Sequence, residues 1–252
     1  MRLLLADPPA PAGFDLGSSL TEADLAALYA VPATTRTWLR ANFASSVDGA
    51  VTGGDGRSGS VNSEADHVVF DVVRALSDVV VVGAGTVRGE GYGPLSAPEH
   101  LAHVRADAGI APVLPLVVVT NHAEVPERLR GAAPGRVLLA THAGAEALDS
   151  ARSLLGEDNV LVCGRSHVDP ESLLTQLGQR GWSRVLTEGG PHLLSTFVGA
   201  GVIDELCLSI TPVVVGGDGP RMTQGLSLSA GFAPRMLVEE DGTVMGRWLR
   251  HA

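Results

Sequence analysis

Residues 187–191, Thr-Glu-Gly-Gly-Pro, place a carboxylate directly before a glycine turn. An apolar run at 185–186 precedes this segment, and a helical pattern over 190–199 follows it. Glycines let a backbone pass close to a ligand, and the free N–H groups at a helix start can bind an anion. Glu188 can act on whatever lies against the turn. The segment therefore predicts a site for a phosphate-bearing cofactor at the end of a strand.

A second glycine turn, Gly83-Ala84-Gly85-Thr86, follows the valine run at 79–82. The sixth position of a dinucleotide-binding G-x-G-x-x-G pattern is Arg88 here, which argues against an ordinary Rossmann domain. Thr86 can donate its hydroxyl to a phosphate, and Arg88 can pair with a 2′-phosphate. A plain turn with a solvated arginine explains the same residues, so both interpretations stay open.

Three charged residues elsewhere are further candidates. Asp48 belongs to a Ser-Ser-Val-Asp-Gly segment directly after a predicted strand, but Asp-Gly is also a common turn. Asp66 and Arg74 lie on a predicted helix over 63–76, within about 80° of each other around its axis. Either they face a pocket, or they complement the dipole at the two ends of the helix.

Composition excludes several classes of function. The net charge of −10 argues against nucleic acid as a partner. The chain of 252 residues contains no lysine, so a Schiff-base lysine is excluded. The eight histidines show no metal-ligand spacing, and we expect no metal site. Walker A, Gly-x-Ser-x-Gly and zinc-deaminase patterns are all absent.

The two cysteines, Cys163 and Cys207, stand apart inside apolar runs and are expected to be buried free thiols. The apolar run at the N-terminus is too short for a signal peptide. No segment approaches 18 uninterrupted apolar residues, so we expect no membrane span and a cytoplasmic protein.

Strands and helices are predicted to alternate along most of the chain, which favours a mostly parallel sheet with helices on both faces. Asp241-Gly242 predicts an antiparallel C-terminal hairpin. Residues 1–36 are expected to form an N-terminal arm on a single domain over 37–252, with a long loop or twisted hairpin at 45–60 and a long loop at 91–112. The predicted strands are 38–44, 79–82, 116–119, 136–140, 160–163, 184–186, 203–211, 213–215, 235–239 and 243–250, and the predicted helices are 22–29, 63–76, 145–155, 170–180 and 190–199.

Taken in order, these motifs resemble the reductase domain of bacterial riboflavin biosynthesis. The resemblance covers roughly residues 38–217 and includes the segments 45–49, 74–78, 82–87, 186–191, 202–206 and 211–217. It implies a dihydrofolate-reductase-like α/β/α sandwich, NADPH as the cofactor and a homodimer, with the strand at 203–210 near the interface. The implied reaction is hydride transfer to a pyrimidine ribosylamine.

The resemblance also assigns roles to residues. Glu188 and Asp66 are the predicted catalytic residues, because either carboxylate can orient or protonate the substrate. The predicted substrate-binding residues, besides Glu188, are Ser58, Arg74 and Asp48. The predicted NADPH-binding residues are Ala44, Ser60, Gly83, Gly85, Thr86, Arg88, Gly189, Gly190, Pro191, His192 and Leu193.

Two departures from the family pattern leave alternatives open. Ala50 stands where many members have a basic residue, and Gly89–Pro94 replaces an Asp-Asp-Pro segment followed by a substrate-binding arginine. Together with the missing deaminase motif, they predict a diverged, stand-alone member. A dihydrofolate or pterin reductase is one alternative, because Asp66 is placed where such enzymes hold the pterin. A non-catalytic nucleotide-binding protein and a different α/β enzyme that binds a mononucleotide are the others.

Overall fold

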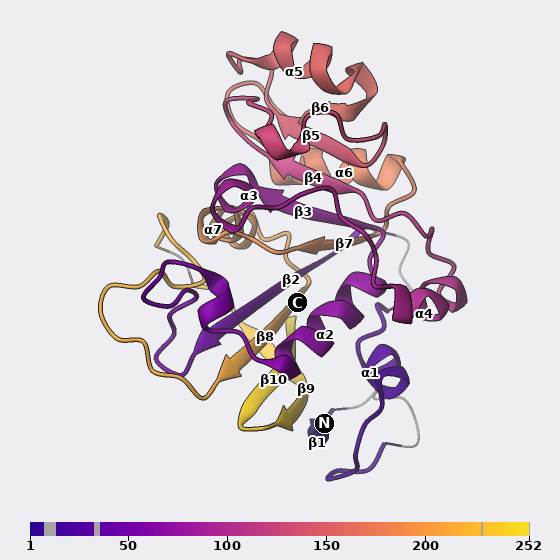
Figure 1. The fold of residues 1–252 in the computed structure, drawn as a ribbon, viewed down its shortest axis with the longest axis vertical. Coiled ribbons are helices and arrows are strands. Elements are labelled where there is room, and N and C mark those ends of the chain that lie inside the picture. The colour runs from indigo at the N-terminus through magenta and orange to yellow at the C-terminus, as the bar shows by residue number, and fades with distance from the viewer. Residues whose placement is uncertain (8–13, 33–35, 228, 252) are drawn as a thin grey trace.

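The computed structural model describes residues 1–7, 14–32, 36–227 and 229–251. They form a ten-stranded mixed sheet in the order β1-β9-β10-β8-β2-β7-β3-β4-β5-β6 (Figure 1). The strands are β1 Arg2–Ala6, β2 Trp38–Ser46, β3 Val79–Gly83, β4 Leu116–Val119, β5 Val137–Thr141, β6 Val160–Val162, β7 Arg184–Thr187, β8 Glu205–Thr211, β9 Phe232–Glu240 and β10 Thr243–Arg250. The helices are α1 Glu22–Leu28, α2 Glu64–Ala75, α3 Ala84–Glu90, α4 Ala102–Asp107, α5 Leu148–Leu155, α6 Pro170–Gln179 and α7 Pro191–Gly199.

The sheet has a parallel part and an antiparallel part. Strands β8, β2, β7, β3, β4, β5 and β6 pair in parallel, whereas β1, β9, β10 and β8 pair antiparallel. The predicted α/β class, with a mostly parallel sheet and a C-terminal hairpin, is confirmed. Asp241 and Gly242 turn that hairpin with positive φ angles of 50° and 77°, as a tight two-residue turn requires.

The valine run of β3 shows why the sheet needs helices on both faces. Val80 and Val82 pack in one apolar cluster and Val79 and Val81 in the other, because successive side chains of a strand point to opposite faces. The first cluster includes residues of α1 and α2, and the second includes residues of α6 and α7. A buried parallel strand of this kind has no polar face.

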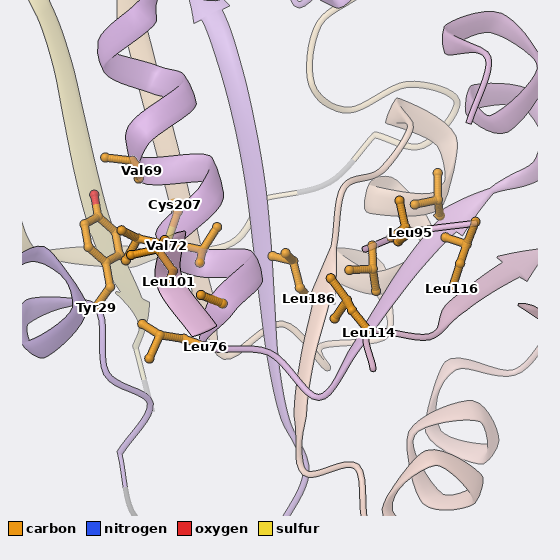
Figure 2. Close-up of a cluster of buried hydrophobic side chains, with 14 of the residues drawn as sticks. Tyr29, Val69, Val72, Leu76, Leu95, Leu101, Leu114, Leu116, Leu186 and Cys207 are labelled. Atoms are coloured by element: carbon orange, nitrogen blue, oxygen red, sulfur yellow. The ribbon is translucent and has the colours of Figure 1, made fainter. Parts of the chain in front are cut away.

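Helix α2 begins and packs as its sequence predicts. The Ser63 side chain accepts a hydrogen bond from the Asp66 N–H at 3.1 Å, so the helix start is capped. Val69 and Val72 repeat at helical spacing and face the first cluster, beside Tyr29 of the segment after α1 (Figure 2). This packing fixes the helix against the sheet and determines where Asp66 and Arg74 lie.

Four segments differ from the prediction. Helix α3 begins directly after Gly83, where only a glycine turn was predicted. Residues 2–6 form the edge strand β1, paired with β9, where no strand was predicted. The predicted strand over 213–215 is wrong: β8 ends at Thr211, because Pro212 has no N–H and Val215 donates to the Asp48 carboxylate instead. The loop predicted over 91–112 contains α4 and a short 3₁₀ turn, Glu99–Leu101.

Cys163 and Cys207 are both buried and unpaired, as predicted. Among the helices of the described residues, none has the length and apolar character needed to cross a membrane.

A buried charge cluster stands where the sheet changes direction. Glu205 of β8 accepts from Arg40 of β2 at 2.7 Å and from Arg247 of β10 at 3.1 Å, and the Trp38 indole N–H donates to it at 3.0 Å. Burial alone would raise the pKa of Glu205, but the two guanidinium groups outweigh it and lower that pKa. Glu205 and Arg40 are 0% and 1% exposed. Loss of one charge would therefore leave a buried charge without its partner.

Replacing Glu205 with Gln is expected to lower the free energy of unfolding by about 3–5 kcal/mol, because two guanidinium groups lose their buried counter-charge. Urea unfolding at fixed protein concentration measures the loss. Glu157→Gln is the control: its carboxylate is 75% exposed and pairs with Arg152 on the surface, so the loss stays under about 1 kcal/mol. Equal losses for the two variants would contradict the prediction.

Candidate functional site

The two glycine turns meet at one edge of the sheet. β3 and β7 are parallel neighbours, and the Gly83 N–H donates to the Gly189 carbonyl at 2.7 Å. Gly189 has a φ of +80°, and a Cβ on it would lie 2.4 Å from Phe43 Cζ. A Cβ on Gly190 would lie 2.4 Å from Thr86 Oγ1. A side chain at either position would require its neighbour to move, so the two glycines allow the two turns to lie side by side.

A cavity of about 610 Å³ opens beside these turns, at the starts of α3 and α7. Its titratable lining side chains are all basic: Arg88, His122, His167 and His192. Several predicted cofactor residues line it, namely Gly83, Gly85, Thr86, Arg88, Gly190, Pro191, His192 and Leu193. We call it the first cavity.

Sequence reasoning missed another part of the first cavity. Thr120, Asn121 and His122 directly follow β4, and His167 and Val168 precede α6. The rule that ligands bind beyond the carboxyl ends of parallel strands was a usable signal for residues 120–122. His167 lies in the loop between β6 and α6, and no sequence motif indicates that this loop returns to the cavity.

A second cavity of about 320 Å³ adjoins the first. Gly85, Thr86, Gly190 and Pro191 line both cavities and form their common wall. Four other predicted residues lie in the second cavity: Ala44, Ser58, Asp66 and Glu188. The sequence did not indicate Asn42, Asn62, Glu90 and Tyr92, which line it as well.

Glu188 is held by three hydrogen bonds. Arg74 donates to its two oxygens at 2.7 and 2.9 Å, and the Tyr92 hydroxyl donates at 2.6 Å. Burial and then the charge of Glu188 raise the pKa of Tyr92, which keeps the phenol protonated as a donor. The Arg74 guanidinium also lies 4.1 Å from the ring centre of Phe70. Arg74 therefore supports Glu188 from behind and does not itself line the cavity.

Asp66 stands in a very different environment. Its side chain is 2% exposed, and its Oδ1 has no hydrogen-bond partner. Burial raises its pKa, while a hydrogen bond with Ser209 of β8 lowers it in part. An incompletely paired carboxylate in a cavity is able to bind an N–H donor or to carry a proton.

The remaining predicted residues lie away from the two cavities or touch them only in part. Asp48 is exposed, and it accepts from Ser46 at 2.5 Å and from the Gly216 N–H at 2.7 Å. These hydrogen bonds, that of Ser46 above all, lower its pKa to about 2, so Asp48 fastens the loop after β8 and does not line either cavity. Ser60 is exposed and bonds to Asp55. Ser58 lines the second cavity and donates its N–H to Glu90 at 3.0 Å.

Asp66→Asn is expected to stabilise the protein at neutral pH. Because the pKa of Asp66 is raised in the folded state, ionisation costs stability as the pH rises above the ordinary value of 3.8. The gain is about 1 kcal/mol, or about 3 °C in Tm, at pH 8, and it disappears below about pH 3.8. Melting curves across this pH range measure it.

Glu64→Gln serves as the control for that experiment. Glu64 also lies in the first turn of α2 but is exposed. Glu64→Gln should not show the pH-dependent increase in melting temperature that is expected for Asp66→Asn. A Tm of Asp66→Asn below that of the wild type at pH 8 would contradict the prediction.

Comparison with known proteins gives a consistent picture. Residues 37–242 match the model of the family described as the RibD C-terminal domain. Riboflavin biosynthesis protein RibD of Mycobacterium tuberculosis is 32% identical over 181 residues, which are 72% of this chain and 43% of that protein. The chain thus spans less than half the length of that relative.

Two further relatives match over most of their own length. The 2,5-diamino-6-ribosylamino-4(3H)-pyrimidinone 5′-phosphate reductase of Archaeoglobus fulgidus is 28% identical over 76% of this chain and 88% of its own. A solved pyrimidine reductase-like protein from Corynebacterium diphtheriae has a TM-score of 0.74 at 23% identity, covering 86% of this chain and 92% of the other. That second likeness shows a shared fold.

Proposed function

We propose, because the chain belongs to the RibD C-terminal domain family, that it is a reductase of riboflavin biosynthesis that transfers a hydride from NADPH to a pyrimidine ribosylamine. The observation that carries this proposal is the common wall of the two cavities, formed by Gly85, Thr86, Gly190 and Pro191. A cofactor in the first cavity and a substrate in the second would meet at this wall. The names of the Archaeoglobus and Mycobacterium relatives support the pathway.

The first cavity fits a phosphate-bearing cofactor. The N–H groups of His192 and Leu193 lie in the first turn of α7, which has no side-chain cap, and the helix dipole favours an anion there. Thr86 adds a hydroxyl, and the basic lining suits further phosphate oxygens. Arg88 would pair with the 2′-phosphate that distinguishes NADPH from NADH. The bound nicotinamide supplies the hydride.

The chain's own side chains would position the substrate. Arg74 and Tyr92 hold the Glu188 carboxylate in a single orientation at the second cavity. Asp66 offers a second carboxylate with an open acceptor. We assign orientation of the substrate to Glu188 and proton supply to Asp66, whose raised pKa suits a general acid. Ala44 of β2 also lines the second cavity.

Titration with NADPH tests the proposal. We expect saturable binding at sub-millimolar concentration, by fluorescence or calorimetry. Arg88→Ala should weaken NADPH binding about tenfold, the loss of one charge-assisted contact, and leave NADH binding within about twofold. Arg2→Ala, an exposed residue of β1, is the matched control. If NADPH does not bind, or if Arg88→Ala affects both cofactors equally, the assignment is wrong.

We also propose that the protein is a homodimer, assembled through the open face of β8, which consists of Leu206, Leu208 and Ile210. These side chains are half-buried, while their neighbours Glu205, Cys207 and Ser209 are buried on the opposite face. Pairing with β10 brings Trp248 beside Leu206 and Val244 beside Ile210. A second copy would cover this apolar strip.

The cytoplasm is the compartment we propose, because it keeps buried thiols reduced.

Light scattering coupled to size exclusion tests the dimer. The wild type should elute with the mass of two chains, and Leu208→Arg should elute with the mass of one, because a charge cannot be buried in an apolar interface unpaired. Leu154→Arg on α5, 49% exposed, should remain dimeric. A monomeric wild type, or an unaffected Leu208→Arg, would refute this part of the proposal.

A further inference from the structure

Residues 212–227, which follow β8, form a loop that we call the strap. It runs from β8 past the loop after β2 to α7 (Figure 1). Its residues Pro220 and Gln224 line the second cavity. Gly225 lies beside His192 of the first cavity, because a Cβ on this glycine would lie 3.0 Å from His192 Nδ1. The strap therefore reaches both cavities and forms part of the wall of the second.

Asp48, in the loop after β2, holds the beginning of the strap. Its carboxylate accepts the N–H groups of Val215 and Gly216 at 3.2 and 2.7 Å. Gly216 and Gly217 have φ angles of +70° and +66°, a conformation that glycine adopts at little cost. Hydrogen bonds to an ionised carboxylate are stronger than those between neutral groups. Asp48 thus fastens the strap where it turns away from β8.

Two further contacts hold the middle and the end of the strap. The Val51 N–H donates to the Pro220 carbonyl at 2.9 Å, and Val51 also lines the second cavity. The Ser195 hydroxyl of α7 donates to the Pro191 carbonyl at 3.0 Å and accepts the Gln224 N–H at 2.8 Å. Ser195 is 1% exposed, so the end of the strap is bound to a buried group.

The small side chain of Ala50 lets the strap pass close to the loop after β2. A Cβ on Gly219 would lie 3.3 Å from the Ala50 Cβ, and Ala50 is buried. A longer side chain at position 50 would meet the strap backbone. The departure from the family pattern at this position therefore accompanies close packing of the strap over the loop.

We propose that the strap is the gate of the second cavity, and that Asp48 and Ser195 are positioning residues that hold it shut from its two ends. Neither residue lines either cavity, so neither needs to touch a ligand. The fraction of molecules with an open strap then determines how fast ligands enter and leave. The inference rests on the proposed function in one respect, namely that the second cavity is the substrate side.

Trypsin tests the fastening in the whole, ligand-free chain. The protein has no lysine, so trypsin cleaves only after arginine, and Arg221 is an exposed residue of the strap. Asp48→Ala and Ser195→Ala should each speed cleavage after Arg221 about tenfold, because cleavage of a native protein follows its open fraction. Cleavage after Arg180, which is exposed at the end of α6, should not change. It would accelerate as well if the variants merely lost stability.

Nitration by tetranitromethane measures access to the second cavity without any assay of activity. Tyr92 lines that cavity, and the only other tyrosine of the chain, Tyr29, is 0% exposed. Mass spectrometry should show that Tyr92 is nitrated about tenfold faster in Asp48→Ala and in Ser195→Ala than in the wild type, because the reagent enters when the strap is open.

Stopped-flow binding of a pyrimidine ribosylamine extends the test to the proposed substrate. The chain is saturated with NADP⁺, which has no hydride to give. Association and release should both be about tenfold faster in the two variants, because each step needs an open strap, while Kd stays within about twofold. A residue that bound the ligand itself would change Kd instead.

Matched controls come from the same loop and from another helix. Asp55→Ala removes an exposed carboxylate of the loop after β2, which accepts from the Arg57 N–H and not from the strap. Ser153→Ala removes a hydroxyl of α5 that donates to the carbonyl four residues earlier, as the Ser195 hydroxyl does. Both variants should behave like the wild type in all three measurements.

The outcomes separate the gate from the proposed function. If cleavage after Arg221 or nitration of Tyr92 is no faster in Asp48→Ala and Ser195→Ala than in the controls, the inference is overturned and the proposed function stands. A changed Kd with an unchanged release rate also overturns it. If neither NADPH nor the pyrimidine binds, the proposed function fails, and cleavage and nitration still decide whether the strap is a gate.

Discussion

The parallel pairing of β3 with β7 is the constraint on which the candidate site depends. Val81 is registered with Thr187, so both strands end at the same edge, and the Gly83 N–H reaches the Gly189 carbonyl. A slip of one residue would turn every side chain of one strand to the other face. It would also part the two glycine turns, and the common wall of the cavities would not form. The valines of β3 hold this register because they are buried on both faces.

The buried charges of Glu205, Arg40 and Arg247 fix the strand register in the other half of the sheet. Arg40 and Glu205 are register partners in the parallel pair β2–β8, whereas Arg247 belongs to the antiparallel neighbour β10. Glu205 meets the guanidinium groups of both neighbouring strands in this alignment, and buried polar groups of this type can fix register. β8 thereby presents Ser209 to the helix α2 side, where its hydroxyl reaches Asp66. The antiparallel half thus acts on the second cavity indirectly, through the hydrogen bond between Ser209 and Asp66.

Local patterns predicted most of the fold and many of the residues that line the two cavities. Valine runs, helix caps and glycine turns are short-range signals, and the sheet rule places strand ends together. The prediction failed where a long-range partner decides the outcome. Residues 2–6 are a strand because β9 offers an edge. Residues 213–215 leave the sheet after Pro212, where the N–H groups of Val215 and Gly216 donate to Asp48. The Arg74–Glu188 pair joins residues 114 positions apart, which no local motif specifies.

The two carboxylates of the second cavity, Glu188 and Asp66, differ in how they are hydrogen-bonded. Glu188 has three donors and accepts from all of them, so its geometry is fixed before any ligand arrives. Asp66 keeps an unsatisfied oxygen in a buried position, which lowers the stability of the free protein and raises its tendency to hold a proton. The two carboxylates of the second cavity thus stand in different environments, one with three hydrogen-bond donors and one with an oxygen that has no donor. The unpaired oxygen of Asp66 costs the free protein stability, and under the proposed function a donor on the substrate would remove that cost.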